Sequence, residues 1–145
     1  ELGYNYRMSN VLAGIGRGQL KVLDERIAKK KYIFEYYKRE LANLEGIQFM
    51  PVNDWNEPNY WLSCILLKGA VRPLDVILAL EKENIESRPL WKPMHMQPIF
   101  KKYDYVGSHV AEDLFENGIC LPSDTKMTDD DLERVTKIIK GLWSK

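Results

Sequence analysis

The feature that most constrains this fold is a helical repeat of apolar residues over the first part of the chain. Apolar side chains recur mainly at steps of three and four from Met8 to Leu44, which is the spacing of one face of an α-helix. A single helix of that span would be about 55 Å long, whereas a compact domain of this size has a radius of gyration of about 15 Å. The repeat therefore predicts two helices that break between Leu20 and Asp24, or one helix that projects onto a partner.

Capping residues mark both ends of this repeat. Ser9 or Asn10 can cap its start, because their side-chain oxygens accept hydrogen bonds from free backbone N–H groups. Gly46 follows the repeat, and glycine readily takes the left-handed conformation past the end of a helix.

The rest of the chain mixes short strands with helices. Apolar runs predict strands at residues 47–50, 60–67, 85–88 and 119–121, and capping signals predict helices that start at Pro73, Ser108 and Thr128. Residues 89–98 contain three prolines, which exclude a regular helix or a central strand. The sequence predicts an α+β fold, with a small, mainly antiparallel sheet and helices packed on one side. We divide it into linking helices at 1–45 and an α+β core at 46–145.

The composition argues against a protein that binds nucleic acid or a membrane. The chain has 145 residues, 45% of them hydrophobic, and its 21 basic and 21 acidic residues give no net charge. Such a chain can bury a core, and it has no basic excess that would favour nucleic acid or an anionic membrane. No apolar stretch approaches the roughly 20 residues of a membrane span. A reduced, cytoplasmic location is the simplest interpretation.

The two cysteines and two histidines suggest no metal site. Cys64 and Cys120 are too few for a disulfide framework, so we interpret them as core residues that could face each other across adjacent strands. His95 and His109 are distant in the sequence and lack carboxylates at ligand spacing.

Two segments near the N-terminus have candidate binding features. Residues 3–10 place Asn5, Arg7 and Ser9 just before a predicted helix, where an anion could bind, or where a polar loop simply caps the helix. Gly14, Gly16 and Gly18 do not fit the dinucleotide-binding pattern. Their spacing favours the close approach of another backbone over nucleotide binding.

A third segment, residues 86–98, gathers polar and aromatic groups on a proline-stiffened loop. Trp91 can stack on a sugar or base, Arg88 can pair with an anion, and His95 can donate or relay a proton. Lys92 would be a solvated or phosphate-facing charge. The alternative is a loop that packs its aromatic residue and leaves its charges in water.

The blocks Gly3–Ala13 and Arg88–Pro98, together with Leu121–Ser123 and Thr128–Asp131, resemble the DegT/StrS family of sugar aminotransferases. The resemblance implies the C-terminal small domain of a fold type I, PLP-dependent enzyme that works as a homodimer. It implies that Asn5 reaches the PLP phosphate of the neighbouring subunit and that Arg7 meets the carboxylate of the amino donor. His95, Arg88 and Trp91 would line the pocket for the donor or the sugar nucleotide.

The segment 88–98 resembles the branch that transfers an amino group, usually from glutamate, to UDP-linked 4-keto-6-deoxy sugars in glycan or exopolysaccharide biosynthesis. The family's Schiff-base lysine and its large PLP-binding domain precede the matching segment. We therefore expect no catalytic residue in this chain, no covalently bound PLP and no activity by the chain alone. A free-standing binding module and an inactive regulatory homologue remain as alternatives.

Overall fold

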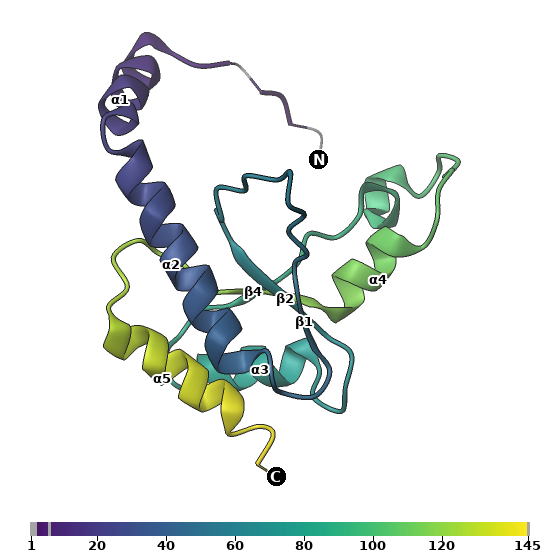
Figure 1. Cartoon of the computed structure of the whole chain (residues 1–145). Coiled ribbons are helices and arrows are strands. Elements are labelled where there is room, and N and C mark those ends of the chain that lie inside the picture. Colours follow the sequence, from purple (N-terminus) through teal and green to yellow (C-terminus); the bar gives the residue numbers. More distant parts are fainter. Residues whose placement is uncertain (1–2, 6, 145) are drawn as a thin grey trace.

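The computed structural model describes residues 3–5 and 7–144, and these form an α+β fold with an antiparallel four-stranded sheet (Figure 1). The predicted fold class is confirmed. The elements in chain order are α1 (Asn10–Leu20), α2 (Leu23–Leu41), β1 (Ile47–Phe49), β2 (Ser63–Leu67), α3 (Pro73–Glu81), β3 (Arg88–Pro89), the 3-10 turns η1 (Met94–Met96) and η2 (Pro98–Phe100), α4 (Val110–Asn117), β4 (Gly118–Leu121) and α5 (Asp129–Lys140).

The N-terminal repeat forms two helices that break where the sequence predicts. Ser9 caps α1, since its Oγ accepts a hydrogen bond from the Leu12 backbone N–H at 3.3 Å. None of the α1 residues is buried, whereas α2 buries four side chains in its second half: Ile33, Phe34, Tyr37 and Leu41. Figure 1 shows α1 projecting beyond the body of the fold, while α2 runs across it.

The sheet has the strand order β1-β2-β4-β3, and each neighbouring pair is antiparallel. Pro89 lies in the edge strand β3, where a missing N–H donor is tolerated. The strand predicted at 85–88 is wrong in its position, because the Ile85 N–H bonds to the Leu80 carbonyl at 3.0 Å and so belongs to the end of α3. Only Arg88 of the predicted residues enters the sheet.

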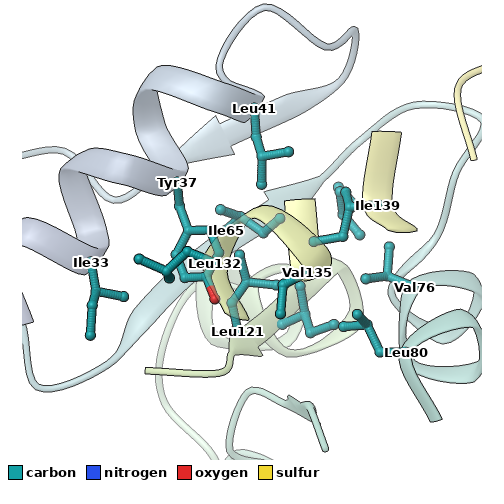
Figure 2. Close-up of a cluster of buried hydrophobic side chains, with 12 residues drawn as sticks. Ile33, Tyr37, Leu41, Ile65, Val76, Leu80, Leu121, Leu132, Val135 and Ile139 are labelled. Atoms are coloured by element: carbon teal, nitrogen blue, oxygen red, sulfur yellow. The ribbon is translucent and has the colours of Figure 1, made fainter. Parts of the chain in front are cut away.

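The hydrophobic core lies between one face of the sheet and helices α2, α3 and α5 (Figure 2). Its central residues are fully buried, including Tyr37 of α2, Ile65 of β2 and Leu132 of α5. Burial of such side chains stabilises the fold by about 1.5–3 kcal/mol each.

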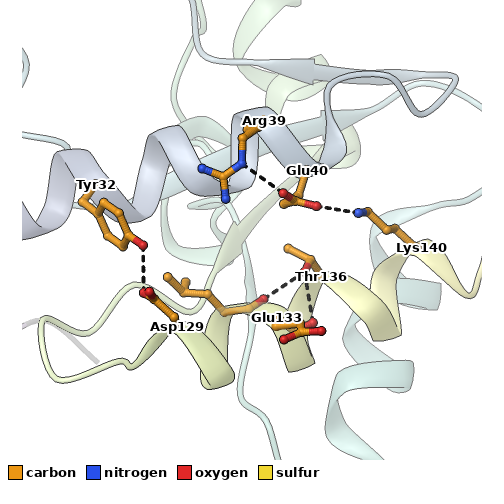
Figure 3. A network of polar contacts seen from close by, with 8 residues as sticks. Tyr32, Arg39, Glu40, Asp129, Glu133, Thr136 and Lys140 are labelled. Atoms are coloured by element: carbon orange, nitrogen blue, oxygen red, sulfur yellow. Dashed lines mark hydrogen bonds and ion pairs between the residues drawn. The ribbon is translucent and has the colours of Figure 1, made fainter.

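Helix α5 begins with a capping box and runs along α2. The Thr128 N–H donates to Asp131 Oδ2 at 2.8 Å, and the Asp131 N–H donates back to Thr128 Oγ1 at 3.2 Å. Two polar contacts then join α5 to α2: the Tyr32 hydroxyl to Asp129 at 2.8 Å, and Lys140 to Glu40 at 2.7 Å (Figure 3). Surface contacts of this kind contribute up to about 1 kcal/mol each, so the apolar packing below them carries most of the helix pairing.

A Tyr37→Phe substitution tests a polar bond that α2 makes inside the core. The buried Tyr37 hydroxyl donates to the Pro122 carbonyl at 2.7 Å, and burial raises the pKa of this phenol, which keeps it protonated. Removal of the donor leaves the carbonyl unpaired, and we expect the free energy of unfolding to fall by about 1–2 kcal/mol in urea titrations. Tyr32→Phe is the matched control: its hydroxyl bonds to Asp129 at the surface, so a change below about 0.5 kcal/mol is expected. Equal losses for both variants would contradict the argument.

Among the described residues no helix combines the length and the apolar character that a membrane crossing requires.

Candidate functional site

The segment before α1 forms a tight turn that presents Asn5 and Arg7 to solvent. The Arg7 backbone N–H donates to Asn5 Oδ1 at 3.0 Å, and Arg7 has a left-handed backbone with φ of 74°. A non-glycine residue in this region is strained by about 1–3 kcal/mol, and the side-chain-to-backbone bond of Asn5 offsets part of that strain. The turn leaves both side chains exposed just ahead of the N-terminus of α1. The Asn5 amide can donate a hydrogen bond, and the Arg7 guanidinium carries a positive charge.

A pocket of about 710 Å³ lies beside the edge strand β3 and the end of β4. Its wall is built from α2, the segments around β2 and β3, helix α4 and strand β4. The residues that matter for the argument are Lys30, Trp61, Arg88, Trp91, Phe115 and Cys120. The structure thus brings together two of the residues that the sequence singled out, Arg88 and Trp91.

Two tryptophans form an aromatic surface at this pocket. The rings of Trp61 and Trp91 have centroids 6.1 Å apart with an interplanar angle of 34°, and the residues are 64% and 67% exposed. Exposed indole rings of this kind suit stacking against a sugar or a base. Trp61 was not singled out from the sequence, because it precedes a strand by two residues and looks like part of an apolar run.

The charged groups at the pocket differ in how tightly they are held. Arg88 donates from Nε to Glu86 Oε1 at 2.7 Å, and both side chains are exposed, so an incoming anion can compete for this guanidinium at little cost. Lys30 is held more firmly by a hydrogen bond to the Ser123 carbonyl. Burial lowers the pKa of the Lys30 amine, and the nearby Asp124 carboxylate opposes that shift.

Lys30 was also not singled out from the sequence, where Lys92 was the lysine assigned to a candidate pocket. A signal for it exists: Lys30 precedes Ile33, Phe34 and Tyr37 by three, four and seven residues, so it shares the buried face of α2. Lys29, four residues before Ile33, shares this signal, so the spacing alone does not select Lys30.

His95 occupies a different place from Arg88 and Trp91. It lies in η1, outside the wall of the pocket, and its Nε2 is 2.9 Å from Glu112 Oε1 while its ring stacks on Tyr105 at a centroid distance of 3.7 Å. The His109 Nδ1 is 3.2 Å from the same carboxylate oxygen. The expectation that the histidines have no carboxylate partner was therefore wrong, since α4 brings Glu112 to both rings.

The Glu112 carboxylate is the centre of this small cluster. Its own backbone N–H lowers the pKa of the Glu112 carboxyl, and the hydrogen bonds from His95 and His109 lower the pKa further against the effect of burial. The second carboxylate oxygen is buried without a partner among the described residues. In the part of the chain that the structure describes, no three potential metal ligands, these side chains included, are arranged so that they could hold a metal ion.

The predicted site residues therefore occupy three separate places in this chain. Arg88 and Trp91 share one pocket, His95 packs beside α4, and Asn5 and Arg7 lie on the turn ahead of the projecting helix α1. Figure 1 shows this N-terminal segment standing off from the sheet. The predicted backbone contact at Gly14, Gly16 and Gly18 is not made by the described residues, because nothing lies within 4 Å of a Cβ built at any of them.

Comparisons with known proteins show the family to which the chain belongs. The sequence profile of the DegT/DnrJ/EryC1/StrS aminotransferase family matches residues 1–140. The chain is 47% identical over 148 residues to EpsN of Bacillus subtilis (strain 168), which is named as a pyridoxal phosphate-dependent aminotransferase, and the match covers 99% of this chain and 38% of EpsN. It is 31% identical over 143 residues to GDP-perosamine synthase of Escherichia coli O157:H7, over 99% of this chain and 38% of that protein.

A solved structure agrees at the level of the fold. Spr1654 of Streptococcus pneumoniae, named as a sugar aminotransferase and solved in its PMP form, superposes with a TM-score of 0.83 at 24% identity. The superposition covers 95% of this chain and 36% of that chain. The chain thus spans less than half the length of the relatives that it matches.

Proposed function

We propose that this chain, which belongs to the DegT/DnrJ/EryC1/StrS aminotransferase family, is the C-terminal domain of a larger sugar aminotransferase. The observation that carries the proposal is the extent of the match, which covers 99% of this chain but only 38% of EpsN and of GDP-perosamine synthase. The reactive lysine would lie in the remaining part of the protein. This chain would then supply binding groups and no catalytic residue, and it would be inactive alone. We assign residues 1–45 as the link to that part and residues 46–145 as the core, into which the second half of α2 packs.

The cofactor of this family is pyridoxal 5'-phosphate, which supplies the electron sink for amino-group transfer when it is bound. The groups on the N-terminal turn fit the phosphate end of such a cofactor. The Asn5 amide can donate to a phosphate oxygen while its Oδ1 holds the Arg7 N–H, and the N-terminus of α1 adds favourable electrostatics. In the proposal Asn5 binds the phosphate held by the neighbouring subunit, and Arg7 binds the carboxylate of the amino donor.

For the acceptor we propose a UDP-linked 4-keto-6-deoxy sugar, with glutamate as the donor. The pocket at Arg88 and Trp91 supports a sugar nucleotide, because its exposed indole rings can stack on a base or sugar and its guanidinium can pair with a diphosphate. His95 would contribute through the loop that it shares with Trp91. The reaction would take place in the cytoplasm, as part of glycan or exopolysaccharide biosynthesis.

The exposed apolar surface of the projecting helix α1 supports the proposal that α1 contacts a partner in the assembled enzyme. Val11, Leu12 and Ile15 are each more than half exposed, and no residue of α1 is buried. Apolar surface of this extent commonly marks an interface, and the open flank at Gly14 and Gly18 would let another backbone approach closely. We propose that α1 packs against the large domain or against a second subunit of a homodimer.

Cofactor spectroscopy on the full-length protein tests the proposed activity. Added PLP should give a protein-bound absorption band, and glutamate should bleach this band in the absence of sugar. Addition of the UDP-linked ketosugar should then restore the band and yield an amino sugar. A spectrum that glutamate leaves unchanged would contradict the proposed activity.

The choice of sugar nucleotide is tested separately in the same assay. UDP-, GDP- and dTDP-linked 4-keto-6-deoxy sugars are compared at equal concentration, and the UDP-linked sugar should restore the band fastest. Faster restoration by the GDP- or dTDP-linked sugar would overturn the UDP assignment and leave the aminotransferase proposal intact.

A further inference from the structure

Two cysteines face each other across the central strands of the sheet. Cys64 of β2 and Cys120 of β4 are direct partners in the antiparallel register, and their Sγ atoms are 3.6 Å apart. Their strand neighbours Ile65 and Ile119 point into the core cluster. Because successive side chains of a strand alternate between faces, the two thiols lie on the opposite face. The sequence-based idea that they could face each other is confirmed.

The pocket gives the thiol pair its contact with solvent. Cys120 is 8% exposed and lines the pocket of about 710 Å³ together with Trp61 and Phe115, and Cys64 is partly buried. A disulfide reagent would therefore approach the pair from this pocket.

The two thiols differ in acidity. The two sulfurs share one hydrogen bond, which either thiol can donate. This contact lowers the pKa of Cys120, while the same contact and burial raise the pKa of Cys64. Thiolate is the nucleophile in disulfide exchange. Because Cys120 lines the pocket and has the lowered pKa, we assign it as the attacking residue and Cys64 as the resolving residue.

We propose that Cys64 and Cys120 form a redox-active dithiol site that closes into a reversible intrachain disulfide by exchange with a disulfide of the glutathione type. First, the Cys120 thiolate attacks one sulfur of oxidised glutathione, a Cys120–glutathione bond forms, and one glutathione thiolate leaves with the electron pair. Next, Cys64 loses its proton to solvent and attacks the Cys120 sulfur, and the second glutathione thiolate leaves. Two protein thiols are oxidised by two electrons, and one glutathione disulfide is reduced to two thiols.

The strand geometry permits this closure without rearrangement of the backbone. Directly opposed residues of antiparallel strands have Cα atoms about 4.5–5.5 Å apart, which lies inside the range of about 4.4–6.8 Å found in disulfides. The sulfurs need to approach by about 1.5 Å to reach the bonded distance, which rotation of the side chains supplies. The inference stands independently of the proposed aminotransferase activity, because it uses only this chain and its two cysteines.

Intact-mass spectrometry of the 145-residue chain after incubation with oxidised glutathione tests the site. We expect the main product to lose about 2 Da, with no glutathione attached, and to contain a peptide cross-link between Cys64 and Cys120. The oxidised chain should melt about 5–10 °C higher than the reduced chain, since the bond closes a long loop, and dithiothreitol should reverse both changes. Stable glutathione adducts, intermolecular dimers or unreacted native chain would each overturn the proposal.

Two serine variants test the assigned roles. Cys64→Ser removes the resolving thiol, so a mixed disulfide at Cys120 should accumulate and persist. Cys120→Ser leaves the less acidic thiol, which should react at least about 10-fold more slowly. The wild-type chain in urea serves as the control, because the loss of strand pairing should turn the product into adducts. Equal rates for the two variants, or the same product in urea as in buffer, would refute the roles that we assign.

Discussion

Gly46→Ala is expected to destabilise this chain by about 2–4 kcal/mol. Gly46 has a φ of +79°, a conformation that is strained for any residue with a Cβ atom. A Cβ at this position would also lie 2.6 Å from the Gly69 backbone nitrogen, where β1 begins beside the end of β2. Because the obstacle is backbone, relief requires the two strands to shift, and the Lys68 N–H bond to the Gly46 carbonyl at 2.8 Å would be disturbed.

Urea unfolding of the variant and of a matched control measures this effect. Gly16→Ala makes the same chemical change in the middle of α1, where nothing lies within 4 Å of the added Cβ. Its free energy of unfolding should not fall, and it should rise by no more than about 1 kcal/mol, because alanine favours a helix more than glycine does. If Gly46→Ala were as stable as Gly16→Ala, the left-handed turn that leads into β1 would be described incorrectly.

Arg7→Ala in the full-length protein should reduce kcat/KM for the amino donor by about 10- to 150-fold, which corresponds to about 1.5–3 kcal/mol for a lost charged hydrogen bond. The reason is that the Arg7 guanidinium is exposed on a turn fixed by Asn5, and the proposal pairs it with the donor carboxylate. The half-reaction with the sugar nucleotide should change much less, since Arg88 and Trp91 line a separate pocket.

Single-turnover measurements of the two half-reactions separate these effects. Arg39→Ala is the control. Arg39 is an exposed arginine near the C-terminal end of α2, far along the chain from Arg7, and it bonds to Glu40 at 3.0 Å. It should leave both half-reactions unchanged. Equal losses for donor and sugar in Arg7→Ala would remove the donor role from this residue.

The sequence predicted those parts of the fold that depend on local chemistry. The break between α1 and α2, the Ser9 cap and the positive φ of Gly46 each follow from residues adjacent in the chain. The same holds for the capping box at Thr128 and Asp131. Local signals suffice there because the hydrogen bonds join residues at most a few positions apart.

Strand limits were less predictable, because they depend on the partner strand. The apolar run at 60–67 predicts a strand from Tyr60, yet β2 begins at Ser63. Ser63 pairs with Leu121, after which Pro122 has no N–H to continue the ladder. Tyr60 instead takes a left-handed backbone with φ of 51°, and its ring packs on Phe34 at 4.8 Å.

The candidate site depended even more on tertiary contacts. Sequence analysis selected Arg88 and Trp91 because they share one loop, but their pocket also needs Trp61 and Lys30 from distant segments. The pairing of His95 with Glu112 joins η1 to α4 across 17 residues, and no spacing rule indicates it. Side chains that meet only through the fold cannot be grouped from a single sequence.

Complementation between two inactive variants of the full-length protein tests most directly whether this domain completes a pocket in the neighbouring subunit. One variant carries Arg7→Ala, and the other lacks the cofactor-binding lysine that we place outside this chain. Arg7 shares a turn with Asn5, which we propose to bind the phosphate held by the neighbouring subunit. Each mixed dimer should then contain one intact site, and random 1:1 mixing should restore about one quarter of the wild-type activity. If mixed dimers form, as shown by differently tagged subunits, and activity stays at the level of the separate variants, the account is contradicted.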